Sequence, residues 1–360
     1  MSESATASAP AKTQPKAKKN RLSSGFFRFV LTRFLLIIPT VFILVTIVFF
    51  VMRATGDPIS AAMGGRLTPE ELQRRIHAAG YDRPLVVQYL DYLGGLLRGD
   101  LGTTLTDNQP VTTILTRYGA ATFELAFLSL IVALIVGIGL GRLAARRRDH
   151  AADAGIRVFA ILCYATPVFF LGLMLKLVFA VWLNVLPPSG RSSFASDMQF
   201  QRLVSPTGFY IIDAFQLGDM SVLVDVLRHA VLPALALGLL TAGVFIRLVR
   251  TNVISTYTSG YVEAARSRGV SEGRLLSKHA WRPAMIPIIT VMGMQIALML
   301  AGAVLTETTF EWKGLGFMLS QYLKQRDFVA VQGIVILIAI IVAVVNFIVD
   351  VTQRARSIRE

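Results

Sequence analysis

The sequence predicts an all-α membrane protein with six transmembrane helices, and three observations carry that prediction. Hydrophobic residues make up 54% of the 360 residues and charged residues only 16%, against roughly 25% charged in an average soluble domain. Six stretches each supply the run of about 20 apolar residues that a bilayer-spanning helix needs. These stretches cover residues 34–52, 122–140, 158–183, 230–249, 286–305 and 331–350.

The third observation is where the charges fall between these stretches. With the N-terminus in the cytosol, the inner segments 1–33, 142–157, 247–282 and 351–360 carry 22 Lys and Arg against 6 acids. The outer segments 53–118, 184–228 and 306–330 carry 13 against 14. This positive-inside bias predicts six spans with both termini in the cytosol. The net charge of +14 therefore reflects membrane topology. Nucleic-acid binding would need a basic face interleaved with aromatic residues, and the sequence shows none.

The sequence offers no catalytic or metal centre. Its single cysteine, Cys163, excludes an intrachain disulfide and a C-x-x-C site, and we expect it to be a small buried apolar residue. The four histidines are scattered, and no G-x-x-x-x-G-K-[ST], H-E-x-x-H or G-x-S-x-G motif is present. The chain is therefore expected to be no enzyme, and in particular no self-sufficient ATP pump.

The two ends of the chain are short polar tails. Residues 1–21 lack apolar periodicity and predict a disordered basic tail near anionic headgroups, and 351–360 form a second cytosolic tail. The segment 22–33 either lies in the interface as an elbow or simply begins the first span. The transmembrane domain is expected to cover 22–350.

The first outer segment, 53–118, is expected to be helical. Thr68, Pro69 and Glu71 form the N-terminal pattern of a helix with a capping box, which should stop at Gly80. A second helix should run from Pro84 to about Leu97 and end at Gly99, with Leu85, Tyr89, Tyr92, Leu93 and Leu96 on one face. This pair forms a cap on the outer mouth of the bundle, either as packing alone or in contact with an extracytoplasmic partner.

The cytosolic loop 250–282 has a shape suited to docking on another protein. A short helix of small residues is expected over 261–268, with Gly269 as the left-handed residue that ends it. Ser271 then caps a second helix. The result is a helix–glycine–helix in a basic loop.

Two charges fall at or inside the spans. Glu124 is expected to be a hydrogen-bonding group of the bundle interior, and Lys176 to snorkel or pair. One carboxylate near an interface does not make a proton relay, which counts against an ion-coupled transporter. Prolines 167, 233, 283 and 287 lie in or at spans, where they either kink helices or only set their ends.

Residues Glu263-Ala264-Ala265-Arg266-Ser267-Arg268-Gly269 match the E-A-A-x-x-x-G signature of ABC importer permeases. From residue 29 to 350 the chain resembles the first permease subunit of the dipeptide, oligopeptide and nickel importers. Other matching blocks are Gly56-Asp57-Pro58, Gly99-Asp100-Leu101-Gly102, Thr166-Pro167, Leu186-Pro187-Pro188-Ser189-Gly190, His229 to Ala234, and Glu307 to Gly316, which fits E-x-x-F-x-W-x-G-L-G. After Gly269 the chain departs from the general ABC pattern, with His279, Trp281 and Arg282 before Pro283 and Pro287, a form similar to the peptide-family variant.

The resemblance implies the type I ABC importer permease fold in a bacterial inner membrane. It implies four kinds of partner: a second homologous permease, two ABC ATPase subunits, an extracytoplasmic solute-binding protein and membrane lipid. ATP and Mg would be bound by the ATPases, so this chain needs no cofactor. The ATPase-coupling residues would be Glu263, Ala264, Ala265, Arg266, Arg268, Gly269 and Arg274, and the gate or translocation path would include Pro167, Pro233, Gln295 and Glu307.

The cargo stays open within this resemblance. Di- and oligopeptides are expected, and a nickel chelate, glutathione or haem are alternatives. An ion-coupled secondary transporter and a structural scaffold are the alternatives from other classes.

Overall fold

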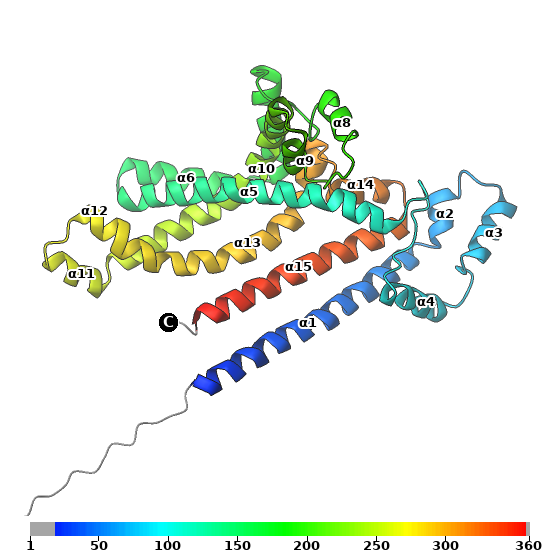
Figure 1. Ribbon diagram of the computed structural model, residues 1–360, viewed down its shortest axis with the longest axis horizontal. Helices are drawn as coiled ribbons and strands as arrows, with labels where there is room; N and C mark the ends of the chain where they lie inside the picture. The colour runs from blue at the N-terminus through cyan, green and yellow to red at the C-terminus, as the bar shows by residue number, and fades with distance from the viewer. Residues whose placement is uncertain (1–18, 358–360) are drawn as a thin grey trace, which may run out of the picture.

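The computed structural model describes residues 19–357, in which the chain is helical apart from its connections (Figure 1). The only extended pairing in that range is an isolated antiparallel bridge between Thr103 and Pro110. The all-α prediction is confirmed. The predicted tail over 1–21 lies outside the described residues except at its last three positions, which already belong to the first helix.

Four single helices are long and apolar enough to cross a membrane. They are α1 (Lys19–Ala54), α5 (Val111–Arg146), α10 (Met220–Tyr257) and α15 (Phe328–Ser357). Two bent pairs raise the number of candidate spans to six: Ala151–Ala165 with Val168–Trp182, and Glu272–Met285 with Pro287–Leu300. All six predicted stretches therefore lie on apolar helices, but two of them are not straight.

The predicted span 158–183 is wrong as a single helix. The chain forms α6 (Ala151–Ala165), then α7 (Val168–Leu175), which continues as the π-helix η1 (Lys176–Trp182), and the helix axis bends by 109° between the two arms. Thr166 is extended, with φ −80° and ψ 126°, and Pro167 caps α7. The clash between a proline ring and the preceding residue disfavours the helical conformation there, and the proline lacks the N–H that would continue the ladder.

The helices extend beyond the predicted stretches, most clearly at α10 and α5. The 38 residues of α10 make a helix of about 57 Å, nearly twice the roughly 30 Å hydrocarbon core, and α5 begins at Val111 instead of 122. Hydropathy marks only the lipid-facing stretch of a helix, so it missed these polar extensions. The extensions carry the functional features described below.

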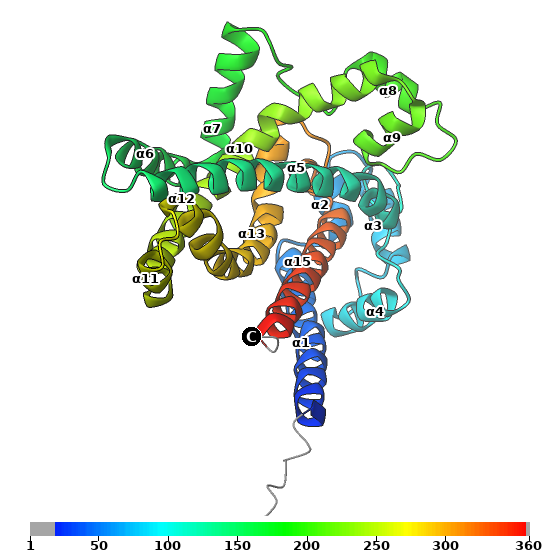
Figure 2. The same cartoon turned by 60° about the vertical axis from the view of Figure 1, so that its left-hand side comes forward.

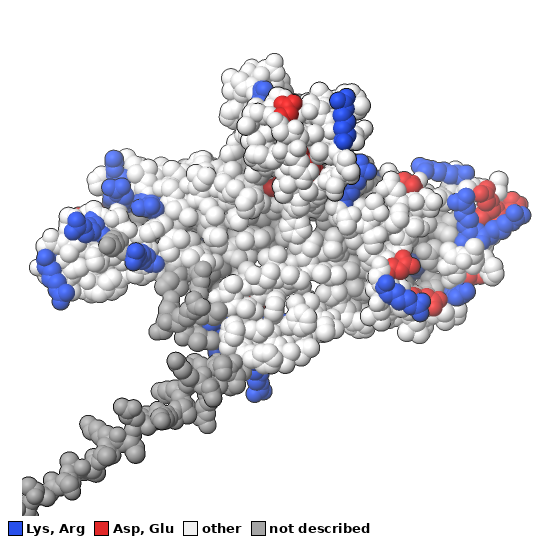
Figure 3. Space-filling view, viewed as in Figure 1, with Lys and Arg blue, Asp and Glu red and all other residues white. Residues whose placement is uncertain are grey.

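The short helices lie at the two ends of the bundle. Figure 1 places α2 (Pro58–Met63), α3 (Pro69–Ala78) and α4 (Leu85–Leu97) at one end, and α11 (Gly260–Ser267) and α12 (Glu272–Arg274) at the other. The helices α8 (Phe194–Phe200) and α9 (Tyr210–Leu217) precede α10, the π-helix η2 (Leu275–Ala280) leads into α13 (Trp281–Phe310), and α14 (Leu315–Lys324) follows α13. On the face shown in Figure 3, charged side chains gather at these two ends and on the lobe of α8 and α9, and Lys and Arg dominate at the α11 end.

The predicted outer helices form as expected. Thr68 accepts a hydrogen bond from the Glu71 backbone N–H at 3.4 Å, and Gly80 and Gly99 are left-handed, with φ of +72° and +79°. The Glu71 carboxylate, predicted to close the capping box, accepts a hydrogen bond from Arg75. Helix α4 packs on α1, where the Phe49 ring lies 5.3 Å from both the Tyr89 and the Tyr92 rings. It therefore flanks the C-terminal half of α1 (Figure 2).

The core of the bundle is the contact between α5 and α10, and glycines let their backbones approach. A Cβ at Gly137 would lie 2.5 Å from the Phe245 Cβ, and one at Gly141 2.7 Å from the Val249 Cβ. On the α10 side, a Cβ at Gly238 would meet the Ser129 carbonyl oxygen at 2.7 Å. Small residues four apart that allow such approach are how membrane helices pack without a hydrophobic driving force.

Replacing Gly141 by alanine is expected to destabilise the protein, because the added methyl overlaps Val249 and overpacking costs about 1–3 kcal/mol. The matched control is Gly139→Ala, two residues along α5, where a Cβ would have no atom within 4 Å and helix propensity gains about 1 kcal/mol. Thermal unfolding in detergent measures both. A Gly141→Ala midpoint at or above that of Gly139→Ala would contradict the proposed contact. Adding Val249→Gly to Gly141→Ala removes the opposing Cβ and should relieve the overlap.

Candidate functional site

The E-A-A segment forms helix α11, which ends in a complete Schellman motif. The Gly269 N–H bonds to the Arg266 carbonyl at 2.9 Å, and the Val270 N–H bonds to the Ala265 carbonyl at 3.3 Å. Gly269 itself has φ +79°, a conformation that costs other L-residues about 1–2 kcal/mol. The predicted helix, its stop at Gly269 and Ser271 as the N-cap residue of α12 are all confirmed.

The predicted coupling residues lie together on the outside of this loop. Glu263, Ala264, Arg268, Gly269 and Arg274 are exposed, and Ala265 and Arg266 are half-buried. The segment is anchored from beneath by Val262 and Leu275, whose side chains are fully buried. This arrangement leaves a small-residue surface free to contact another protein.

Arg266 organises the charges of the loop. Its Nε donates to Glu272 at 2.8 Å, and its Nη1 donates to Glu263. The guanidinium lies 5.0 Å from the centre of the Tyr257 ring, and the Tyr257 hydroxyl donates to Glu272. The Glu272 carboxylate is the main reason that the pKa of Arg266 is raised. The sequence analysis assigned Glu263 to an ATPase contact, and the structure adds a partner within the loop while leaving its side chain 64% exposed.

A second cluster of polar residues ties α9 and the segment before α8 to α5. Arg191 is buried and donates from Nη2 to Glu124 at 2.5 Å and to the Gly208 carbonyl at 3.0 Å. Its guanidinium also stacks 3.7 Å from the centre of the Tyr210 ring. Glu124 accepts a further bond from the Ile211 N–H at 2.8 Å. The interior role predicted for Glu124 is confirmed, and its partner Arg191, which follows the Pro-Pro-Ser-Gly block, was missed.

The Glu307–Gly316 block forms a second set of polar contacts with α5. Glu307 is fully buried, accepts from the Thr122 hydroxyl at 2.6 Å and from the Phe317 N–H at 2.9 Å. Trp312 is fully buried, and its Nε1 donates to the Ala121 carbonyl at 2.9 Å. A Cβ at Gly314 would lie 2.4 Å from the Glu307 carboxylate. The block thus locks α13 and α14 to α5, and a place for Glu307 in the gate stays a prediction.

The other predicted path residues are spread over three helices. Pro167 stands at the break between α6 and α7, Pro233 is buried inside α10, and Gln295 is half-buried in α13. Near the far end of α7, Lys176 donates to the Thr309 carbonyl at 2.9 Å, which confirms the predicted pairing. Cys163 is buried, as predicted.

The fold combines long apolar helices, packed closely through glycines, with an exposed helix–glycine–helix at one end. The family described as "Binding-protein-dependent transport system inner membrane component" matches residues 137–357, and its N-terminal counterpart matches residues 26–125. The chain belongs to this family and is a multi-pass permease subunit.

Its relatives narrow the class further. The chain is 37% identical over 325 residues to the di/tripeptide transport system permease protein DppB of Pseudomonas aeruginosa, covering 90% of this chain and 95% of that protein. It is also 37% identical over 326 residues to the dipeptide transport system permease protein DppB of Escherichia coli K12, with the same coverage. A chain of the inward-facing MetNI methionine ABC transporter aligns at 15% identity with a TM-score of 0.48, over 68% of this chain and 96% of that one.

Arg191→Met is expected to release the segment 192–218 from the bundle, because it leaves the Glu124 carboxylate buried without its partner. Breaking a buried ion pair from one side costs about 3–5 kcal/mol. Limited proteolysis of this segment and thermal unfolding measure the effect. Arg202→Met, at an exposed arginine of the same segment, is the control. The double variant Glu124→Gln/Arg191→Met should be more stable than Arg191→Met alone, and a single variant as resistant as the control would contradict the fastening role.

Proposed function

We propose that this chain is the membrane-spanning permease subunit of an ATP-driven importer of di- and oligopeptides. The observation that carries the proposal is 37% identity, over 90% of the chain, to permeases of dipeptide transport systems. The exposed, Schellman-closed α11 supports it, because it offers the docking surface that such a permease needs. Both termini are proposed to face the cytosol, on the grounds of the positive-inside bias.

The partners follow from this proposal. A second homologous permease would complete the path, two ABC ATPase subunits would bind ATP and Mg and hydrolyse the nucleotide, and an extracytoplasmic solute-binding protein would deliver the cargo. The domain division proposed for this chain is a transmembrane unit over 22–350 with an outer region at 53–118, a coupling loop at 250–282 and a tail at 351–360.

Coupling would pass from α11 into α10. The helix α11 follows the end of α10 directly, and Tyr257, the last residue of α10, is tied to Glu272 and Arg266. Because α10 packs on α5 along its length, a displacement of α11 by closure of the ATPases would move both helices as one body. Alternating access by such rigid-body motion would open the path to one side at a time. Pro167, Pro233, Gln295 and Glu307 are the residues proposed for that path or its gate.

Glutathione is a second candidate cargo. The chain is 31% identical over 328 residues to the glutathione transport system permease protein GsiC of Salmonella choleraesuis, covering 91% of this chain and 96% of that protein. Both cargo classes carry peptide bonds and free carboxylates, and the binding protein would choose between them.

Gly269→Pro is expected to abolish transport while the complex still assembles. Proline fixes φ near −65° and lacks an N–H, so it can neither adopt φ +79° nor donate to the Arg266 carbonyl. Peptide-stimulated ATP hydrolysis and dipeptide uptake into proteoliposomes measure coupling. Gly273→Ala, at a loop glycine whose Cβ would meet no atom within 4 Å, should keep both activities. Normal uptake by Gly269→Pro would refute α11 as the coupling helix.

Purifying the tagged chain from detergent-solubilised membranes should also bring down a second permease, ATPase subunits and a solute-binding protein, which mass spectrometry identifies. The binding protein can then be screened by calorimetry with dipeptides, longer peptides and glutathione. A chain that purifies alone, and transports after reconstitution without an ATPase, would overturn the importer proposal in favour of an ion-coupled transporter.

A further inference from the structure

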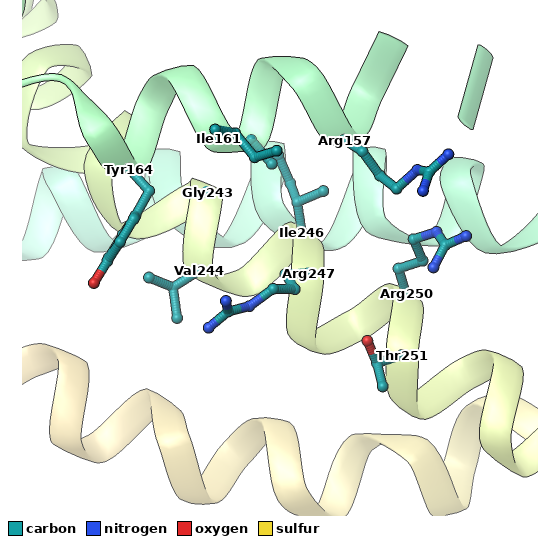
Figure 4. Close-up of a pocket in the computed structure, with 10 residues that line it drawn as sticks. Arg157, Ile161, Tyr164, Gly243, Val244, Ile246, Arg247, Arg250 and Thr251 are labelled. Carbon is teal, nitrogen blue, oxygen red and sulfur yellow. The ribbon is translucent and has the colours of Figure 1, made fainter. Parts of the chain in front are cut away.

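A groove between α6 and α10, near the α11 end of the bundle, has a chemistry that the transport role does not account for. It encloses about 200 Å³ and is lined from these two helices by ten residues, which include three arginines and no acid (Figure 4). Arg157 comes from α6, and Arg247 and Arg250 come from α10. The groove therefore lies between two helices and carries a surplus of positive charge.

That surplus is only partly neutralised. Asp153 is fully buried, and Arg250 holds both of its oxygens, from Nε at 2.6 Å and from Nη2 at 2.7 Å. Arg157 lies 3.8 Å from the same carboxylate and keeps 55% of its side chain exposed. Arg247 is exposed and has no ion pair within the described residues 19–357. Asp149 also acts on Arg250 through its charge, but it pairs with Arg148, so the three arginines of the groove still outnumber their carboxylate partners and leave positive charge for a ligand.

The rest of the groove wall is apolar and reachable. Ile161 and Tyr164 are each 64% exposed, and they stand with Val244 beside the arginines. Figure 4 shows Arg157 and Arg250 at one end of the groove, Tyr164 and Val244 at the other, and Arg247 between them. A ligand that fits both parts carries negative charge and an apolar tail.

We propose that this groove binds an anionic phospholipid of the cytosolic leaflet, with its phosphate on the arginines and its acyl chains along Ile161, Tyr164 and Val244. Basic pockets between transmembrane helices on the cytosolic side suit such headgroups, and arginine forks hold phosphate strongly. The level of the groove in the membrane depends on the orientation proposed above, in which all three arginines lie in the cytosolic halves of their helices.

A peptide cargo fits the groove less well. A peptide is a zwitterion, and its ammonium group would need an acid within reach. The acid at this site, Asp153, is fully buried and already holds two hydrogen bonds from Arg250. The phosphate of a lipid has no such requirement, and its chains cover the apolar wall. The lipid would hold α6 against α10 beside the coupling loop.

The test is lipid binding by the purified complex, measured by native mass spectrometry while phosphatidylglycerol is titrated in. The variant Arg157→Gln/Arg247→Gln should weaken phosphatidylglycerol binding roughly tenfold or more. The control, Arg146→Gln/Arg147→Gln, removes the same charge from exposed positions at the end of α5 and should leave the affinity within about twofold of the wild type. Arg157→Lys/Arg247→Lys keeps the charge, should retain most of the binding and shows that the fold tolerates substitution there.

Two further probes decide the ligand class. Phosphatidylcholine should bind weakly and without dependence on the arginines, and glycerol phosphate should not displace phosphatidylglycerol. Equal phosphatidylglycerol binding by the Gln pair and the wild type would overturn the proposal. So would displacement by glycerol phosphate, which would indicate a free-phosphate site, or lost dipeptide uptake with unchanged lipid binding, which would assign the groove to the cargo path. Because the binding measurement needs neither ATP nor cargo, it fails independently of the proposed function.

Discussion

The close contact between α5 and α10 is the constraint on which the rest of the structure depends. Gly137 and Gly141 bring the two backbones together where any side chain would collide with Phe245 or Val249. Once this pair is set, α10 offers its other side to α6, where a Cβ at Gly243 would lie 2.7 Å from the Ala160 carbonyl oxygen. In its N-terminal half α5 presents Thr122 and Glu124 to the segments that follow α7 and α13. The contacts at both ends of the molecule therefore depend on this packed helix pair.

The two ends are held by different physics. At the end remote from α11, the Glu124–Arg191 pair and the Glu307–Thr122 bond are buried. Buried polar groups specify an arrangement because removing one partner costs several kcal/mol, roughly 3–5. At the α11 end, the Arg266–Glu263 and Arg266–Glu272 pairs involve carboxylates that are 64% and 59% exposed, and exposed pairs contribute about 0–1 kcal/mol each. The loop therefore relies on Val262, Leu275 and its Schellman motif for its shape. Its exposed charged side chains are then free to form new ion pairs with another protein.

Local signals predicted well, and long-range pairings did not emerge from the sequence. Thr68, Gly80 and Gly269 were found because capping and left-handed positions depend on neighbours within a few residues. The hydropathy pattern located the six apolar stretches but could not find the break at Thr166–Pro167, because the residues on both sides are apolar. Arg191 was missed since its partner Glu124 lies 67 positions away. The Glu307–Gly316 block was recognised as a pattern, and only the structure explains why Gly314 must lack a side chain beside Glu307.

The position of the break in α6–α7 follows from which neighbours each arm has. The α6 arm is fixed to α10 by Asp153–Arg250 and by the contact at Gly243. The α7 arm is fixed to the end of α13, where Lys176 bonds to Thr309 and Phe310 lies 3.0 Å from the Cβ position of Gly172. Pro233 interrupts the hydrogen-bond ladder of α10, but α10 packs on α5 along its length, and Asp225 on the N-terminal side of Pro233 accepts a hydrogen bond from the Ser193 N–H at 2.8 Å. Both arms that meet at Pro167 also pack on α10, so the chain changes direction there without leaving that helix, and α10 is the common support of the two arms.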